Sequence, residues 1–371
     1  MLKEIGSNFW CDVSVLQDDL GDSVINMLNY GISGEDVVFL STGRAAILYA
    51  IKDIKKAKDK GDLIALIPSY TCDTVLQPFL DENIVTYAYD INEKLEINEK
   101  SFIEKMDEFS PDIVLIHRYF GFDNSIDIND KLQMFSKIGC IFIEDRTQSL
   151  FSDYKTLDVD YIVGSFRKWT ALPDGGFCVK KKRKFVFDEI PKCTDDLLIT
   201  SKLKAFQQKN DYMLYNEGEK EEFLNSYRVA EEILNKEKKF FCMSDISKHL
   251  LRELDVAWMI EKRRQNYSFF VNNINNHEIS CVMGELPDGV VPLYLLIRSP
   301  HRNELQIELR KHAIYAPIVW PKPEKMPPVS KLVDDIYKEV LCLPVDQRYD
   351  IDDMDRMVSV VNDFNFMGER R

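Results

Sequence analysis

The first half of the chain alternates short apolar runs with amphipathic stretches, and this alternation constrains the fold more than any other feature. The apolar runs are expected to be buried strands, and the stretches between them are expected to be helices. Strand–helix alternation at this spacing favours a mostly parallel sheet covered by helices on both faces. The predicted strands lie at Val37–Leu40, Leu63–Ile67, Ile84–Tyr89, Ile113–Ile116, Cys140–Ile143, Tyr161–Val163 and Phe177–Val179. The predicted helices lie at Arg44–Lys58, Asp73–Leu80, Phe102–Glu108 and Lys131–Lys137.

From about Lys202 the pattern changes to long charged helices followed by a mixture of strands and helices. The later predicted elements are helices at Tyr215–Lys239, Ile246–Asn272, Arg302–His312 and Ile351–Phe364, with strands at Val290–Ile297 and Val340–Leu343. A chain of 371 residues can form two hydrophobic cores. We therefore predict an α/β domain over residues 1–245 and a smaller C-terminal α+β domain over residues 246–371.

Composition excludes several classes of function. The formal charge of −14 disfavours nucleic acid or an anionic membrane surface as the main partner. No run approaches the roughly 20 apolar residues that span a bilayer, and the N-terminus has no apolar signal segment, so a cytoplasmic protein is expected. The eight cysteines form no CxxC pair, which argues against a zinc ribbon and a disulfide framework. The basic run Lys180–Lys184 is interpreted as a solvated loop, with a phosphate contact as the alternative.

The run Ser41-Thr-Gly-Arg44 ends one predicted strand and opens a helix. Thr42 and Gly43 would present backbone N–H groups at the positive end of that helix, which suits a phosphate. Serine and threonine are also ordinary helix N-caps, so this motif has a purely structural interpretation as well. Arg44 is a candidate to bind the carboxylate of an amino donor, or to pair with a structural acid.

The stretch Val163–Gly176 is the most informative part of the sequence. Lys168 closely follows a buried strand and precedes a Gly-Gly turn and another apolar strand, an unusual setting for a surface lysine. Pyridoxal phosphate (PLP) enzymes need a lysine that bonds the cofactor, an acid against the pyridine nitrogen and small donors around the phosphate. Lys168 is placed to hold the cofactor, and the hydroxyl of Ser165 to reach its phosphate. Arg167 is a second candidate for a donor carboxylate, or a partner of a structural acid.

Two other strand ends carry polar residues. Asp145 ends an apolar strand and is the candidate acid for the pyridine nitrogen, although a strand-end aspartate also caps turns. His117 ends another strand and either lines the pocket or is a satisfied core histidine.

Several motifs together resemble the DegT/DnrJ/EryC1/StrS family of PLP-dependent sugar aminotransferases. The matching segments extend over nearly the whole chain, and they are specific as a set rather than singly. They are Ser41-Thr-Gly-Arg-Ala-Ala-Ile47, Pro68-Ser-Tyr-Thr-Cys72, His117-Arg-Tyr-Phe-Gly121, Glu144-Asp-Arg-Thr-Gln148, Lys262-Arg-Arg-Gln-Asn-Tyr267, Ile318-Val-Trp-Pro321 and Leu343-Pro-Val-Asp346.

The resemblance implies an aspartate-aminotransferase-like fold (PLP fold type I), with a large domain built on a mostly parallel sheet. It implies that Lys168 carries the cofactor, that Asp145 contacts the pyridine nitrogen, that Gln148 lies near the ring hydroxyl and that Ser165 contacts the phosphate. It places Trp320 near the substrate. Members of the family are homodimers that move an amino group, usually from glutamate, to a keto-sugar that is usually linked to a nucleotide.

Three departures from the family pattern concern the cofactor pocket. Only Arg167 separates Phe166 from Lys168, where the family has three residues. The aromatic residue that stacks on the ring aligns with Cys72, so Tyr70 or another residue is expected to take that role. The family's Gly-x-Asn-x-Arg segment aligns near residues 239–243, which contain no Asn.

The sequence therefore predicts a PLP-dependent aminotransferase acting on a keto-sugar in surface polysaccharide or related biosynthesis. A PLP-dependent lyase or dehydratase is the nearest alternative, because it needs the same cofactor residues. A protein that keeps the fold and binds PLP or a sugar without turnover is the alternative outside enzymes.

Overall fold

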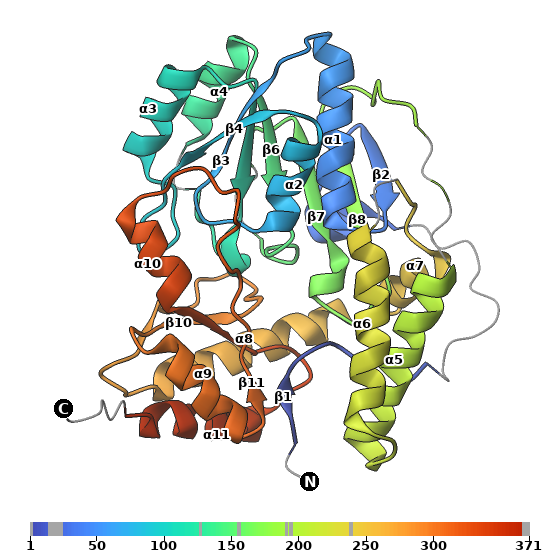
Figure 1. The fold of residues 1–371 in the computed structure, drawn as a ribbon, viewed down its shortest axis with the longest axis vertical. Helices are drawn as coiled ribbons and strands as arrows, with labels where there is room; N and C mark the ends of the chain where they lie inside the picture. Colours follow the sequence, from blue (N-terminus) through green and yellow to red (C-terminus); the bar gives the residue numbers. More distant parts are fainter. Residues whose placement is uncertain are drawn as a thin grey trace. The chain divides into compact units, whose positions relative to one another are not determined.

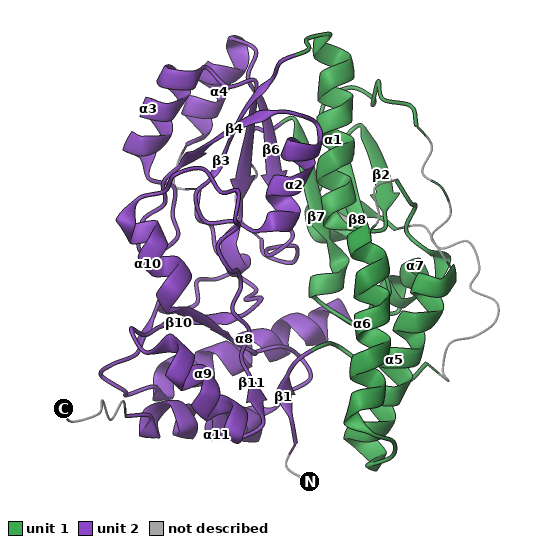
Figure 2. Ribbon diagram, viewed as in Figure 1, with its two compact units in different colours: residues 1, 8–61, 160–254 green, residues 2–7, 62–159, 255–371 purple. Residues whose placement is uncertain are grey.

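The computed structural model describes residues 3–13, 25–125, 128–153, 157–189, 192, 196–236 and 240–365. The chain divides into two compact units (Figure 2). Unit 1 contains residues 8–61 and 160–254, and unit 2 contains residues 2–7, 62–159 and 255–371. Each unit thus combines segments that are far apart in the sequence. The domain division predicted at residues 245 and 246 stays a prediction.

Unit 1 contains three antiparallel strands in the order β2-β8-β7. They are β2 (Asp36–Leu40), β7 (Tyr161–Ser165) and β8 (Gly176–Lys180). Helix α1 (Gly43–Lys58) packs against β7 and β8 through a buried face (Figure 1). The basic residues 181–184 lie in the loop that follows β8, as predicted, and the ammonium of Lys180 itself binds the buried carboxylate of Asp53 at 2.6 Å.

Two long helices of unit 1, α5 (Asp196–Tyr215) and α6 (Lys220–Lys236), pack side by side (Figure 1). The predicted helix Tyr215–Lys239 was wrong at its start, because Asn216 and Gly218 adopt positive φ angles and separate the two helices. Its residues 237–239 lie outside the described residues. Helix α5 was predicted only in part, as the charged helical pattern that starts at about Lys202, because lysines occupy part of its buried face and interrupt the apolar pattern.

The predicted helix Ile246–Asn272 was also wrong, because the structure divides it into two. Helix α7 (Asp245–Arg252) ends unit 1, and α8 (Val256–Asn273) belongs to unit 2. Asp255 caps α8, since its carboxylate accepts a hydrogen bond from the Trp258 N–H at 2.9 Å. Charged residues lie on both sides of this cap, so the apolar periodicity of the sequence does not reveal the break between α7 and α8.

Unit 2 contains four parallel strands in the order β6-β5-β3-β4, which agrees with the parallel sheet expected from the sequence. The strands are β3 (Ile64–Pro68), β4 (Val85–Tyr89), β5 (Ile113–His117) and β6 (Ile141–Asp145). The helices between and beside them are α2 (Asp73–Asp81), α3 (Glu99–Phe109) and α4 (Asn129–Lys137).

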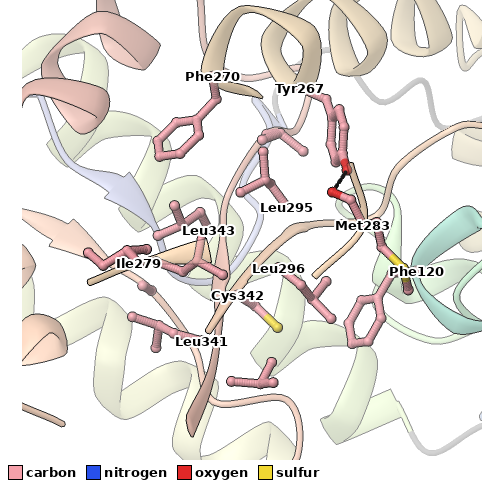
Figure 3. Packing of buried hydrophobic residues seen from close by; sticks show 14 of the residues in the cluster. Phe120, Tyr267, Phe270, Ile279, Met283, Leu295, Leu296, Leu341, Cys342 and Leu343 are labelled. Carbon is pink, nitrogen blue, oxygen red and sulfur yellow. Dashed lines mark hydrogen bonds between the residues drawn. The ribbon is translucent and has the colours of Figure 1, made fainter. Parts of the chain in front are cut away.

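The remainder of unit 2 is a small α+β assembly of C-terminal residues and the strand β1. Its core packs aliphatic and aromatic residues such as Phe120, Phe270, Leu295 and Leu343 (Figure 3). Strand β10 is shorter than the predicted run Val290–Ile297. The elements are β1 (Ile5–Gly6), β9 (Ser280–Cys281), β10 (Leu295–Arg298), α9 (Arg302–Lys311), β11 (Ile314–Tyr315), α10 (Lys331–Glu339), β12 (Val340–Leu343) and α11 (Ile351–Asp363). No helix in the described ranges has the length and apolar character needed to cross a membrane.

A buried ionic cluster fixes the ends of β5 and β6. The carboxylate of Glu144 is fully buried and accepts hydrogen bonds from Arg118 Nε at 2.7 Å and from Arg146 Nε at 3.3 Å. Arg118 also donates to Ser125 Oγ at 2.7 Å and forms an ion pair with Asp123. Removing the negative charge would leave buried cations with too little compensation.

We expect Glu144→Gln to lower the free energy of unfolding by about 3 kcal/mol, because the amide keeps the shape but loses the charge. Urea denaturation measures the change. The matched control is Glu108→Gln, since the Glu108 side chain is 55% exposed and pairs with Lys105 on the helix surface. That control should change stability by less than about 0.5 kcal/mol. Equal stability of the two variants would contradict a structural role for the cluster.

Candidate functional site

In unit 1 the predicted phosphate loop and the predicted cofactor lysine follow two strands that flank the same glycine. Leu40 at the end of β2 and Ser165 at the end of β7 both pair with Gly176 at the start of β8. A Cβ at Gly176 would lie 2.3 Å from the carbonyl carbon of Thr42, so only glycine permits this approach of the two backbones. The antiparallel register therefore brings Thr42 and Ser165 to one edge of the sheet.

Thr42 is the N-cap of helix α1, and its hydroxyl accepts a hydrogen bond from the Ala45 N–H at 3.0 Å. The structural interpretation of this motif is therefore correct. The cap still leaves the first N–H groups of a long helix, at Gly43 and Arg44, without partners inside the helix. The positive end of the helix dipole also lies there, so the same residues remain suited to an anion.

The other predicted donors of unit 1 make contacts within the protein. The Ser165 hydroxyl donates to the carbonyl oxygen of Gly175 at 3.1 Å, which ties the end of β7 to the Gly-Gly turn. The guanidinium of Arg44 donates to the carbonyl oxygen of Leu234 in α6. The Arg44 side chain thus links helix α1 to helix α6.

Lys168 ends the short 3₁₀ helix η3 (Phe166–Lys168), which directly follows β7, and its side chain is exposed. The next residue, Trp169, is fully buried and anchors the backbone beside the lysine. Arg167 forms an ion pair with Glu231 of α6 at 3.0 Å. The structure therefore pairs Arg167 with an acid, the second of the two roles expected from the sequence.

In unit 2 the predicted acid lies against the predicted histidine. His117 and Asp145 are register partners at the ends of the parallel strands β5 and β6. His117 Nδ1 lies 3.2 Å from Asp145 Oδ2, and both side chains are buried. Burial raises the pKa of Asp145, but the hydrogen bond and charge of His117 and hydrogen bonds from Thr147 outweigh it. The pKa of this carboxyl group therefore lies below its ordinary value.

A third residue extends this pair. The Thr71 hydroxyl lies 2.8 Å from Nε2 of His117, and Thr71 is fully buried. Because Asp145 is ionised, the proton of the His117–Asp145 contact belongs to Nδ1. In a neutral imidazole, Nε2 then accepts the hydroxyl proton of Thr71. Thr71 was not singled out from the sequence, although its place in the loop after β3 is a signal that could have identified it.

Aromatic rings cover the His117 side of this pair. The ring of Trp320 lies 5.5 Å from that of His117 and 5.5 Å from that of Tyr70, measured between centroids. The Tyr70 hydroxyl donates to the carbonyl oxygen of Val319 and accepts from the N–H of Trp320 at 3.2 Å. Trp320 thus packs against His117, the register partner of Asp145, and its expected place near the substrate stays a prediction.

Tyr70, expected to stack on the cofactor ring, and Cys72, which stands where the family has its stacking aromatic residue, differ in exposure. Tyr70 is only 1% exposed and is held by hydrogen bonds on both its hydroxyl and its backbone carbonyl. Cys72 is half-buried, and its thiol lies 3.0 Å from the hydroxyl of Thr74. Gln148 is buried and accepts from the Phe120 N–H through its Oε1 at 3.2 Å, so its NH₂ group is the end that a ring oxygen would require.

No protein-family model matches this chain, and no curated protein matches it. Solved structures do match over nearly the whole length. Helicobacter pylori PseC, an aminotransferase involved in the biosynthesis of pseudoaminic acid, superposes with a TM-score of 0.68 at 13% identity, covering 97% of this chain and 98% of its own. The sugar aminotransferase CalS13 from Micromonospora echinospora gives 0.64 at 14% identity, covering 98% and 99%. A DegT DnrJ EryC1 StrS aminotransferase from Brucella abortus gives 0.63 at 15%, covering 90% and 87%.

The chain has the fold of sugar aminotransferases. This likeness confirms the predicted fold class, and it confirms at the level of fold the resemblance drawn from the motifs. At identities of 13–15% it does not identify the substrate or the role of any single residue.

Proposed function

We propose that the protein is a PLP-dependent aminotransferase that moves an amino group from a donor, glutamate being the first candidate, to a nucleotide-linked keto-sugar. The observation that carries the proposal is the buried His117–Asp145 pair at the ends of two neighbouring parallel strands. A pyridine ring acts as an electron sink only while its nitrogen stays protonated, which requires an acid that is ionised at neutral pH. The lowered pKa of Asp145 meets this requirement.

The residues of both units fit the chemistry of PLP. Unit 1 offers a helix N-terminus for the phosphate, a backbone approach at Gly176 that only glycine permits, and an exposed amine at Lys168. Unit 2 offers the ionised acid and the amide of Gln148. When bound, PLP would supply an electrophilic aldehyde carbon and a ring that takes up the electron pair of a broken C–H bond.

The side chains of this chain would then have distinct tasks. The amine of Lys168 would hold the cofactor and, once released, move a proton to and from the carbon that carries the amino group. Asp145 would accept the hydrogen bond of the ring N–H, and His117 would keep Asp145 ionised and oriented. Trp320 would shield the substrate from water. Arg167 would bind a donor carboxylate only by exchanging it for Glu231.

We also propose that the protein forms the homodimer that the family resemblance implies. The donor, the sugar and the nucleotide are proposed on the motif resemblance, and the sugar is also supported by the name of a matching structure, the sugar aminotransferase CalS13. Small-angle scattering or sedimentation of the purified protein would measure its oligomeric state.

We expect His117→Phe to shift the acid limb of the pH profile of kcat/KM upward by about one pH unit. His117 lowers the pKa of Asp145, so removing it raises that pKa, and activity is lost at a higher pH as the solution is acidified. Phenylalanine suits the aromatic surroundings of this site. His277→Gln is the control, because His277 is exposed. An unchanged acid limb in His117→Phe would contradict the role given to His117.

The experiment that tests the function uses the PLP-loaded protein and glutamate without any sugar. Transamination requires release of the keto acid of glutamate in an amount equal to the enzyme present, followed by turnover when a keto-sugar nucleotide is added. Release of ammonia instead would favour a lyase or dehydratase. A PLP-loaded protein that is inert towards every amino donor would favour a binding protein without turnover.

A further inference from the structure

Two buried hydroxyl groups lie on the loop that joins β3 to α2, and they differ in their hydrogen bonds. The side chains of Ser69 and Thr71 are both fully buried. Within the described residues the Ser69 hydroxyl makes no hydrogen bond, whereas the Thr71 hydroxyl lies 2.8 Å from Nε2 of His117. Valine has the shape of threonine and would fill the space at Thr71 without burying a polar group. The hydroxyl of Thr71 is therefore the property to explain, and its contact with His117 explains it.

This contact completes the hydrogen bonding of the His117 ring. Nδ1 of His117 lies 3.2 Å from Asp145 Oδ2, and Nε2 meets Thr71, so both ring nitrogens have a partner. The torsion that turns a histidine ring is broad, so one hydrogen bond alone lets the ring rotate easily. Partners at both nitrogens fix its plane. The other oxygen of the Asp145 carboxylate accepts from the Thr147 N–H at 2.8 Å, so the acid is held from two sides as well.

Tyr337 of α10 holds Thr71 in the position that this contact requires. Its hydroxyl oxygen accepts from the Thr71 N–H at 2.8 Å. The same hydroxyl lies 3.0 Å from each of the carbonyl oxygens of Ser69 and Thr71, between which its single proton is shared. Burial raises the pKa of Tyr337, so the hydroxyl keeps that proton at neutral pH. A residue of the C-terminal helix α10 thus fixes the loop that carries Thr71.

We propose that Thr71 is a positioning residue, whose hydroxyl, placed by Tyr337, holds the His117 imidazole in the orientation in which Nδ1 donates to Asp145. The use of this orientation at a pyridine nitrogen rests on the proposed function. The chain of hydrogen bonds from Tyr337 to Asp145 is a property of the protein without cofactor. Thr71 acts through His117 and requires no contact with cofactor or substrate.

The test uses the full-length, cofactor-free protein labelled with nitrogen-15 in its histidines, at alkaline pH, where histidine is ordinarily neutral. Proton–nitrogen correlation NMR gives the chemical shift of each ring nitrogen and thus shows whether it is a donor, a hydrogen-bonded acceptor or a free acceptor. The chain has five histidines, and the His117 signals are those missing from the spectrum of His117→Phe. In the wild-type protein we expect the proton on Nδ1 and a hydrogen-bonded acceptor at Nε2.

Thr71→Val removes the hydrogen bond at Nε2 and keeps the shape of the side chain. We expect the Nε2 signal to move to the range of a free acceptor, and the Nδ1 proton to exchange with water about tenfold faster, since one hydrogen bond is lost. Thr71→Ser retains the hydroxyl and should restore both values. Tyr337→Phe should change both in the same direction but by less, because the Thr71 hydroxyl is still present.

Ser69→Ala is the matched control, since it removes the neighbouring buried hydroxyl that has no partner among the described residues, and it should leave the His117 signals unchanged. A Thr71 that only stabilises the loop would lower the melting temperature of Thr71→Val without moving these signals, and that result would overturn the proposal. If Thr71→Val does not fold, the wild-type spectrum and Tyr337→Phe still decide. A free acceptor or a proton at Nε2 in the wild type, or unchanged signals in Tyr337→Phe, would also overturn it.

Kinetics of the same variants separates the role of Thr71 from the proposed function. If the PLP-loaded wild type transfers the amino group of glutamate, Thr71→Val should lower kcat about tenfold and leave KM for glutamate nearly unchanged. The expected NMR changes in a protein that never transfers an amino group would refute the proposed function alone. Amine transfer by a protein whose His117 signals do not respond to Thr71→Val would refute the role of Thr71 alone.

Discussion

Lys168→Ala is expected to lower the rate of amine transfer by about 10²- to 10⁴-fold, the range found when a general acid–base group is lost. The amine has two tasks in the proposed reaction, holding the cofactor and moving a proton, and alanine can do neither. Because the Lys168 side chain is exposed, the substitution should leave the free energy of unfolding nearly unchanged.

Single-turnover kinetics with glutamate measures this effect, and circular dichroism checks the fold. Lys184→Ala is the matched control, since Lys184 is an exposed lysine in the loop after β8. Adding a small primary amine such as methylamine should restore part of the rate in Lys168→Ala by replacing the missing base. Wild-type rates in Lys168→Ala would exclude the lysine from the chemistry.

Asp145→Asn is expected to lower kcat by about 10²- to 10³-fold, the cost of losing one preorganised electrostatic partner. Asparagine keeps the size of the side chain and can still contact His117, but it has no charge to retain a proton on the ring nitrogen. The affinity for the phosphate should change little, because the predicted phosphate contacts come from unit 1.

Glu144→Gln is the informative comparison, because Glu144 and Asp145 are consecutive residues of the same strand. Asp145→Asn should reduce activity far more than stability, and Glu144→Gln should reduce stability far more than the activity of the folded fraction. Denaturation curves and kinetics on the same samples give both quantities. If both variants lost only stability, Asp145 would be a structural residue like its neighbour.

The sequence predicted the strands better than the helices. All seven predicted strands of the first half lie within or overlap observed strands, because buried strands are short apolar runs bounded by turns, whether their neighbours are parallel or antiparallel. The helix boundaries around residues 215 and 254 were missed. There the breaks depend on the positive φ of Asn216 and on the cap at Asp255, which an apolar pattern does not record.

Some residues of the site could likewise be predicted from the sequence, and others could not. Three of the site residues end strands, namely His117, Asp145 and Ser165, and Lys168 closely follows one. A strand prediction therefore places them near strand ends without any knowledge of distant contacts. Lys202 and Glu231 could not be found, because they lie in helices whose sequences resemble ordinary solvated surfaces. Lys202 of α5 binds Glu231 of α6 because the two helices pack together, which brings together residues 29 positions apart.

Mapping the attachment site of PLP would decide whether Lys168 carries the cofactor. The protein is incubated with PLP, reduced with borohydride to make the bond permanent, digested and analysed by mass spectrometry. We expect a single labelled peptide that contains Lys168 in the wild-type protein, and no label on that peptide in Lys168→Ala. A label on another lysine, such as Lys202, or no label in the wild-type protein would contradict it.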